Sequence, residues 1–147
     1  MPSSTKKVLL YLISKLGICE GRKKLMKLMF LIEHYDLKNK ILLSKPRLGD
    51  TFLIYQYGVF SFDVMEAYEE LLKEGRVSEG FSGIAVKPGI QIDLDEETRE
   101  VVDEVVRRFG GYGGYELETL TLQMLGIRPF EKDRYFGRKV QEILAGR

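Results

Sequence analysis

The amino-acid sequence predicts one mainly α-helical (α+β) domain over residues 1–147, with five to six helices, a small β-hairpin and a winged-helix-like core. Three observations lead to this prediction. Apolar residues recur at helical spacing in several segments. Glycines and prolines separate those segments. Hydrophobic residues make up 44 % of the chain and charged residues 31 %, which is the composition of a globular protein of single-domain length.

Three helices are predicted in the first half of the chain. Residues 4–16 carry an apolar face with lysines outside it, and Gly17 ends the segment. Residues 22–35 repeat leucine, methionine and isoleucine at helical intervals, and the short loop before them should pack this helix against the first. Residues 61–74 form the third helix, with Ser61 as its N-cap.

The β elements are expected to be short. Residues 51–57 are rich in β-branched and aromatic side chains, which predicts a short strand that Gly58 breaks. Residues 37–48 show no clear pattern, and Pro46 stops any helix there. Residues 77–92 alternate short apolar pieces with glycine and proline, which predicts a β-hairpin or wing.

The second half of the chain is predicted to be helical again. Asp93 or Asp95 caps a helix that runs to residue 109. The glycine run 110–114 predicts a mobile turn and not a phosphate loop, because the Gly-Lys-Ser/Thr ending is missing. Further helices are predicted at residues 115–125 and, after a turn at Pro129, at residues 132–146.

The composition limits the classes of protein to which this chain can belong. A net charge of +1 argues against binding of nucleic acid through positive charge spread over the whole surface. Cys19 is the only cysteine, so no internal disulfide forms, as is usual in a reducing cytoplasm. No apolar run approaches the ~20 residues of a membrane helix, and no signal peptide is visible, so we expect a soluble, cytoplasmic protein without membrane contact. Abundant Lys, Arg and Glu, with Asn39 as the sole asparagine, are typical of thermophile proteins.

The residues needed for catalysis or for metal binding are missing from the sequence. His34 is the only histidine, so the sequence offers neither a His-rich metal site nor a Ser-His-Asp triad with a histidine to spare. We expect it near a helix C-terminus as a solvated or capping group. The acidic residues 93–97 are expected to complement the dipole at a helix N-terminus. The sequence therefore predicts a protein that is not an enzyme and that uses no metal and no cofactor.

Four basic residues open the second helix, where the helix dipole disfavours positive charge. They are Arg22, Lys23, Lys24 and Lys27. Two interpretations stay open: the four pair with acidic side chains of the same chain, or they bind an anionic partner. Lys24 and Lys27 share a face that borders the apolar stripe, so their aliphatic stems are also candidates for internal packing.

Two tyrosines complete the candidate partner-binding residues. Tyr57 belongs to an aromatic group that either joins the core or forms a binding platform, together with Tyr55, Phe60 and Phe62. Tyr112 stands at the tip of the glycine run, where it either tucks onto the body of the domain or contacts a partner.

Three helices followed by a hairpin also describe a winged helix-turn-helix, whose helix before the wing enters the DNA major groove. Here that helix carries five carboxylates against a single lysine, Lys73. Moving carboxylates toward phosphates is electrostatically unfavourable, so protein binding is the favoured function. A nucleic-acid-binding regulator that uses the basic cluster at residues 22–27 is the alternative hypothesis.

Two motifs within residues 21–75 resemble the Panacea domain and the related YwgA group. The first is a Lys-Leu-x-Lys-Leu helix with an aromatic residue two positions on, present at residues 24–30 (KLMKLMF). The second is a Tyr-Gly-Pro-Tyr/Phe-Ser turn before a helix that ends in glycine, present at residues 57–61 (YGVFS). Val59 stands where the family usually has proline, so the stiffness of this turn differs.

The resemblance implies a mostly helical domain that is often an antitoxin, neutralising a partner protein by direct contact. In some members it implies an adaptor toward proteolysis. We therefore expect a non-enzymatic protein-interaction module whose partner is a protein such as a toxin encoded nearby. A second copy of the chain, forming a homodimer, is a further candidate partner.

Overall fold

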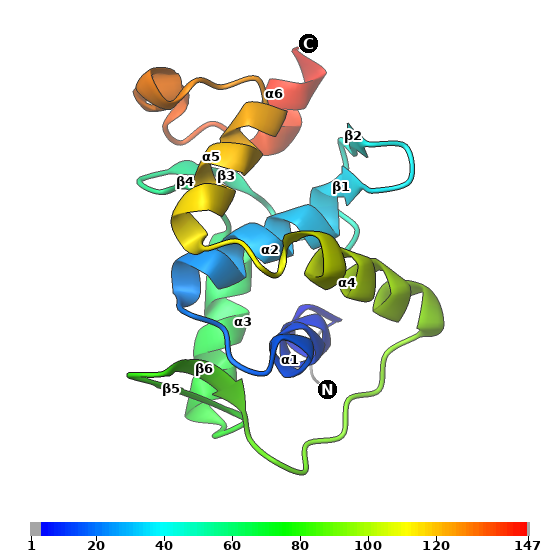
Figure 1. Cartoon of the computed structure of the whole chain (residues 1–147). Coiled ribbons are helices and arrows are strands. Elements are labelled where there is room, and N and C mark those ends of the chain that lie inside the picture. The colour runs from blue at the N-terminus through cyan, green and yellow to red at the C-terminus, as the bar shows by residue number, and fades with distance from the viewer. Residues whose placement is uncertain (1–3, 147) are drawn as a thin grey trace.

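A computed structural model describes residues 4–146 and places one helix at the centre of the fold. This helix, α2 (Arg22–His34), is surrounded by other elements on all sides (Figure 1). The helices α1 (Ser4–Leu16), α3 (Phe62–Lys73), α4 (Glu96–Phe109) and α5 (Gly114–Met124) pack around it. The predicted class, mainly α with small β-hairpins, is confirmed.

The first three helices lie where the sequence predicts them. Ser61 caps α3, and its hydroxyl accepts the backbone N–H of Val64 at 3.2 Å. The third helix is followed directly by the hairpin of β5 (Val77–Gly80) and β6 (Gly83–Val86), which is the helix-then-wing order of a winged helix. Helix α4 begins after Asp95, whose carboxylate accepts the N–H of Thr98, so Asp95 and not Asp93 is the cap.

Two further hairpins replace what the sequence predicts as one strand and an irregular stretch. Strand β3 (Leu53–Tyr55) pairs antiparallel with β4 (Gly58–Phe60), and Gly58, expected to break the strand, is instead the first residue of β4. Its φ of 89° is a conformation that suits glycine. Earlier in the chain, β1 (Tyr35–Asp36) pairs with β2 (Ile41–Leu42). Strands of two or three residues carry too little periodicity for prediction.

The wing is fixed to the loop between α1 and α2. Cys19 and Ile84 exchange backbone hydrogen bonds of 2.9 Å and 2.7 Å, which adds a third extended residue beside the hairpin. A Cβ atom at Gly83 would lie 2.4 Å from the Cys19 carbonyl oxygen, so this close approach requires glycine. The buried thiol of Cys19 has a pKa raised to about 11 by burial.

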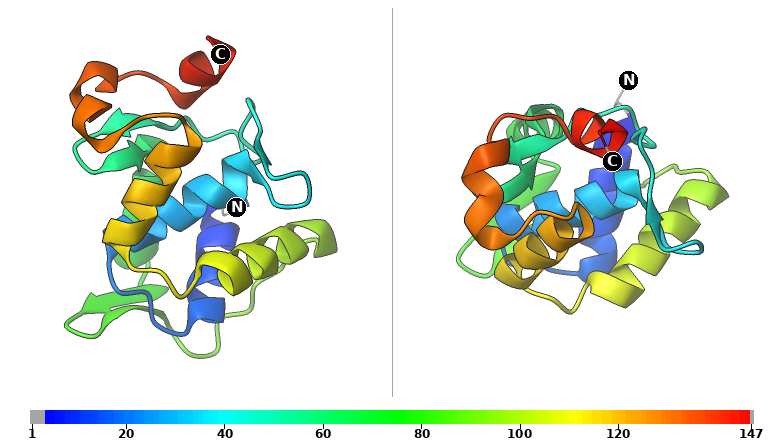
Figure 2. Two further views of the ribbon diagram at one scale, coloured as in Figure 1. Left: turned by 45° about the horizontal axis from the view of Figure 1, so that its top comes forward. Right: turned by 90° about the horizontal axis from the view of Figure 1, so that it is seen from above.

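The predicted C-terminal helix at residues 132–146 is wrong. The segment is a 3-10 helix, η1 (Pro129–Tyr135), followed by a turn and by the short helix α6 (Val140–Ala145). Gly137, with a φ of 82°, interrupts the helix. The chain beyond it lies along β3: the Ile54 N–H donates to the Arg138 carbonyl at 3.0 Å, and the Gly137 N–H donates to the Ile54 carbonyl at 2.7 Å. This segment lies at the opposite end of the molecule from the wing (Figures 1 and 2).

Helix α2 is buried around its whole circumference. Every residue from Lys24 to His34 is buried, including four ionisable side chains. His34, expected to be solvated or capping, is fully buried; its ring stacks on Phe30 at a centroid distance of 5.3 Å, and its Nδ1 lies 2.8 Å from the Leu43 carbonyl oxygen. The periodicity of the sequence shows one apolar face, but enclosure by α4, α5 and the β4 hairpin buries the other faces too.

Glu33 is the single carboxyl group in the sequence of this helix. One of its oxygens accepts the N–H groups of Leu48 at 3.1 Å and Asp50 at 3.2 Å. Burial and the neighbouring Asp50 carboxyl raise the pKa of Glu33 to about 10. Asp50 in turn accepts the hydroxyl of Thr5 on α1 at 2.7 Å, so this cluster ties α1 to α2.

A Glu33→Gln variant should become more stable relative to the wild type as pH rises. Between pH 5 and pH 9 folded Glu33 keeps a proton that the unfolded chain releases, so its contribution to stability falls with pH. The slope of this contribution against pH is at most about 1.4 kcal/mol per pH unit.

Glutamine at position 33 keeps the oxygen that accepts the two N–H groups and does not titrate. Urea unfolding at each pH unit measures the difference, with the exposed Glu66→Gln as control. Parallel pH curves for wild type and Glu33→Gln would contradict the assignment.

Candidate partner-binding groove

A groove of about 330 Å³ opens between the first half of α2, the β3–β4 hairpin and the start of α3. Its charged lining residues are Arg22, Lys23 and Lys27, and none of the described carboxylates lines it. The other lining residues are apolar, aromatic or amide side chains: Met26, Tyr55, Gln56, Tyr57, Phe60 and Met65. Four of the six predicted partner-binding residues therefore meet at one place.

One hydrogen bond joins the two sequence motifs. The Lys27 Nζ, from the motif on α2, donates to the backbone carbonyl of Val59, in the turn motif, at 2.9 Å. Gly58 beside it lies under α5, where a Cβ atom would lie 3.1 Å from Glu118 Cγ. Because the acceptor is a backbone carbonyl, proline or valine at position 59 supplies it equally well. The replacement of the usual proline by Val59 therefore leaves this contact intact.

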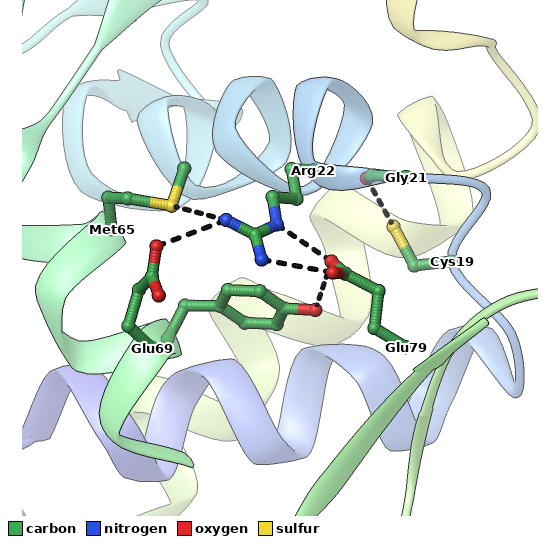
Figure 3. Close-up of polar contacts among 7 residues, drawn as sticks. Cys19, Gly21, Arg22, Met65, Glu69 and Glu79 are labelled. Carbon is green, nitrogen blue, oxygen red and sulfur yellow. Dashed lines mark hydrogen bonds and ion pairs between the residues drawn. The ribbon is translucent and has the colours of Figure 1, made fainter. Parts of the chain in front are cut away.

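Arg22 is held by carboxylates of its own chain. Its guanidinium donates to both Glu79 carboxylate oxygens, at 2.7 Å and 2.9 Å, and to Glu69 at 3.1 Å (Figure 3). It also lies over the ring of Tyr68, at 5.2 Å from the centroid. Arg22 thus links α2 to α3 and to strand β5, and its charge is already matched.

Lys24 does not reach the surface groove. Its side chain is buried, and its Nζ donates to the Gly110 carbonyl at 2.7 Å and pairs with Glu20 at 2.7 Å. The first glycine of the predicted loop is therefore an acceptor that docks the chain after α4 against α2. The burial of Lys24 removes it from the residues able to contact a partner directly.

Lys23 lies at the rim, between two exposed tyrosines. Its Nζ is 5.0 Å from the ring centroid of Tyr57 and 5.4 Å from that of Tyr115, and it pairs with Glu118 at 2.6 Å. Glu118 also pairs with Lys132 at 3.3 Å. The contacts of the ammonium with both rings hold the two tyrosines on either side of one cation.

Lys27 differs from the other three basic residues. Only 2 % of it is exposed, and among residues 4–146 no carboxylate forms an ion pair with it. Burial lowers its pKa to about 7, while the charge of Glu118 acts in the opposite direction. The groove thus has a buried, weakly basic amine that uses one of its possible hydrogen bonds.

Exposed aromatic side chains surround the groove. Tyr57 is 62 % exposed and Tyr115 is 77 % exposed, and Phe62 is also exposed while its ring packs edge-on to Tyr55. Tyr112 is partly tucked against Phe109, at a centroid distance of 6.4 Å, and shares a second, shallow hollow with Tyr115. Tyr57 therefore borders the groove, whereas Tyr112 lies beside the neighbouring hollow.

The sequence analysis missed three contributors to this surface. Tyr115 and Glu118 lie on α5, and Met65 lies on α3, far from the basic cluster along the chain. A Cβ atom at Gly114 would lie 3.2 Å from Lys23 Cγ, so the glycine before Tyr115 is what lets α5 approach α2. In the sequence, the sign of this close approach is a glycine directly before Tyr115. The sequence alone does not show which helix approaches there, because that depends on the fold.

The described residues contain neither a cluster of metal ligands nor a helix able to span a membrane. No group of three or more His, Cys, Asp or Glu side chains within residues 4–146 could hold a metal ion. Over the same residues, none of the helices has both the length and the apolar character needed to cross a bilayer.

Comparison with known protein families finds a match over most of the chain. The family described as antitoxin SocA-like, Panacea domain, matches residues 25–124, which is more than half of the chain. The match contains residues 25–30 of the first motif, with Lys27, and the whole second motif with the β3–β4 hairpin, and it confirms the resemblance predicted from the motifs. No curated protein and no solved structure matches the chain.

A Lys27→Met variant should be more stable than the wild type below pH 7. Methionine keeps the aliphatic packing and removes a buried cation without a carboxylate partner, and below pH 7 we expect this gain to exceed the loss of the hydrogen bond to the Val59 carbonyl. The folded pKa of about 7 lies below the ordinary value of 10.5, so the destabilisation is full below pH 7 and is relieved as pH rises toward 10.5. The advantage of methionine should therefore shrink above pH 7, by at most about 1.4 kcal/mol per pH unit.

Urea unfolding between pH 6 and pH 10 measures this difference. The matched control is Lys24→Met, which also removes a buried amine but breaks its contacts with Glu20 and the Gly110 carbonyl. The control should lose stability, because it breaks an ion pair as well as a hydrogen bond, whereas Lys27→Met breaks a hydrogen bond alone. A loss of stability in Lys27→Met as large as in the control would show that Lys27 is a structural residue.

Proposed function

The chain belongs to the antitoxin SocA-like Panacea domain family, and from this premise we propose that it is a non-enzymatic protein-interaction module. In this proposal it neutralises a partner protein in the manner of an antitoxin. The contact surface is the groove together with its exposed aromatic rim, Tyr57 and Tyr115.

The observation that carries the proposal is the position of this surface. The groove forms where the two family motifs meet, at the hydrogen bond between Lys27 and Val59. Its lining combines Met26, Met65 and aromatic rings, and methionine and aromatic residues are enriched in protein interfaces. Exposed tyrosines beside a concave apolar site are typical of residues that dominate binding energy.

Charge favours a protein partner over nucleic acid. The helix before the wing, α3, keeps Glu66, Glu69 and Glu70 partly or fully exposed, and the hairpin β5–β6 carries Glu79 and no basic residue. Three of the four basic residues that a nucleic acid would need are paired with carboxylates of the chain. Neither surface offers the row of free cations that binds phosphates.

Co-expression with the product of the adjacent gene tests the proposal. We expect that product to arrest growth alone, and the arrest to be relieved, with co-purification, when this chain is present. A Tyr57→Ala, Tyr115→Ala double variant should weaken binding at least tenfold, about 1.4 kcal/mol, because both rings lie exposed at the rim. The matched control is Phe81→Ala, which removes a fully exposed ring at the wing tip.

The control variant should bind and rescue like the wild type. A toxic neighbour that this chain neither rescues nor co-purifies with would rule out the antitoxin role. Equal loss of binding in the Phe81 and tyrosine variants would move the contact surface away from the groove. Measuring the mass of the purified chain by light scattering separates binding of a partner from association with a second copy.

A further inference from the structure

We infer that the groove recognises an acidic side chain in an apolar segment of the partner protein, with Lys27 as its counter-ion. The inference rests on the proposed role of the groove as a partner-binding site. It goes further by naming what chemistry the partner must present.

Three of the four basic residues at the start of α2 form ion pairs, and Lys27 forms none among the described residues. Arg22 is matched by Glu79 and Glu69, Lys23 by Glu118, and Lys24 by Glu20. Lys27 is the most buried of the four, and among the described residues its Nζ donates only to the Val59 carbonyl. A charged amine has three donors, so Lys27 can donate to a carboxylate without losing its present bond.

The environment of Lys27 suits a carboxylate carried on an apolar segment. The walls contain Met26, Met65 and Phe60, and the low dielectric that they create strengthens a charge pair inside the groove. Within residues 4–146 no carboxylate lines the groove, and the carboxylate that acts on Lys27, Glu118, is already held by Lys23 and Lys132. An incoming acidic side chain therefore meets positive charge and little repulsion.

Beyond the hydrogen bond to the Val59 carbonyl, the fold gains nothing from this amine that methionine would not supply. A buried cation without a counter-ion destabilises a protein, whereas a methionine of similar shape packs well. Residues that lower stability are typical of functional sites, where binding recovers what folding loses. The geometry therefore points to a counter-ion that arrives with the partner.

Binding should be linked to proton uptake. The charged groups that act on Lys27 are Glu118 of α5, Lys23 of α2 and Lys132 of η1. A bound carboxylate would raise the pKa of Lys27 above its value of about 7. Above pH 7 the free protein must then take up a proton to bind, so the affinity should fall by up to about tenfold per pH unit.

Capped tripeptides test the inference on the full chain. The probe is acetyl-Phe-Glu-Phe-amide, whose only carboxylate is the glutamate side chain, and its matched control is acetyl-Phe-Gln-Phe-amide. Nuclear magnetic resonance of labelled lysine follows the Lys27 amine directly in the wild type. We expect the glutamate peptide to bind about tenfold more tightly at pH 6.5 and to raise the pKa of Lys27 by about one unit.

Two variants sharpen the test. Lys27→Met should bind both peptides equally, at the affinity of the wild type for the glutamine peptide. Lys45→Met removes an exposed lysine in the loop after β2 and should keep the preference for glutamate. Thermal unfolding confirms that each variant is folded, and the resonance shift in the wild type needs no variant.

Three results would overturn the inference. One is equal affinity of the two peptides for the wild type, and another is a glutamate preference that survives in Lys27→Met. The third is a stronger shift of Lys27 with acetyl-phenylalanine than with the glutamate peptide, which would assign the groove to a chain terminus. Because no toxin is present in this assay, its outcome is independent of the co-expression result.

Discussion

The enclosure of α2 is the constraint on which the rest of the structure depends. A helix that is buried on all sides must satisfy its polar side chains within the fold. Each of them finds one partner: Lys24 the Gly110 carbonyl, Lys27 the Val59 carbonyl, and His34 the Leu43 carbonyl through Nδ1. Glu33 accepts N–H groups of the loop before β3 through one oxygen, while its other oxygen and the His34 Nε2 have no hydrogen-bond partner among residues 4–146. Each buried polar group therefore fixes the position of a loop, a turn or a short hairpin against α2.

The groove follows from this arrangement. Lys27 holds the β4 end of the hairpin against α2, while Gly58 and Gly114 permit α5 to approach both elements closely. The hairpin then stands away from α2 on its outer side, and the tyrosines at its turn and on α5 are left exposed. Backbone acceptors and glycines thus bring segments that are far apart in the chain close together. The exposed rings of Tyr57 and Tyr115 lie on these segments and so come close to the groove.

The sequence predicts the elements that are determined by their own residues, through apolar spacing and caps. It misses the elements that are determined by contacts with distant segments of the chain. Helices α1, α3 and α4 follow from apolar spacing and from caps such as Ser61 and Asp95. The C-terminal helix was wrong because β3 offers residues 137–140 backbone hydrogen bonds that compete with the helix. For the site, the basic cluster pointed to α2, but only the packing of α4 and the hairpin buries Lys24 and Lys27 and leaves Lys23 at the rim. The burial of His34 has the same cause, since no periodicity encodes a helix that is covered on every face.

The two most perturbed groups of α2 affect stability with opposite signs. Burial favours the neutral form of both, so folded Glu33 keeps a proton and folded Lys27 gives one up. Above pH 7 the contribution of Glu33 to stability falls as pH rises, whereas that of Lys27 improves, and the two slopes have opposite signs until pH approaches 10. The slopes of these two groups therefore partly offset each other in the wild type while both groups titrate abnormally. Of these two residues, Lys27 lines the groove and Glu33 does not. A partner carboxylate would therefore favour the charged form of Lys27 and leave Glu33 neutral. The buried charge on α2 would then be set by occupancy of the groove and not by the fold alone.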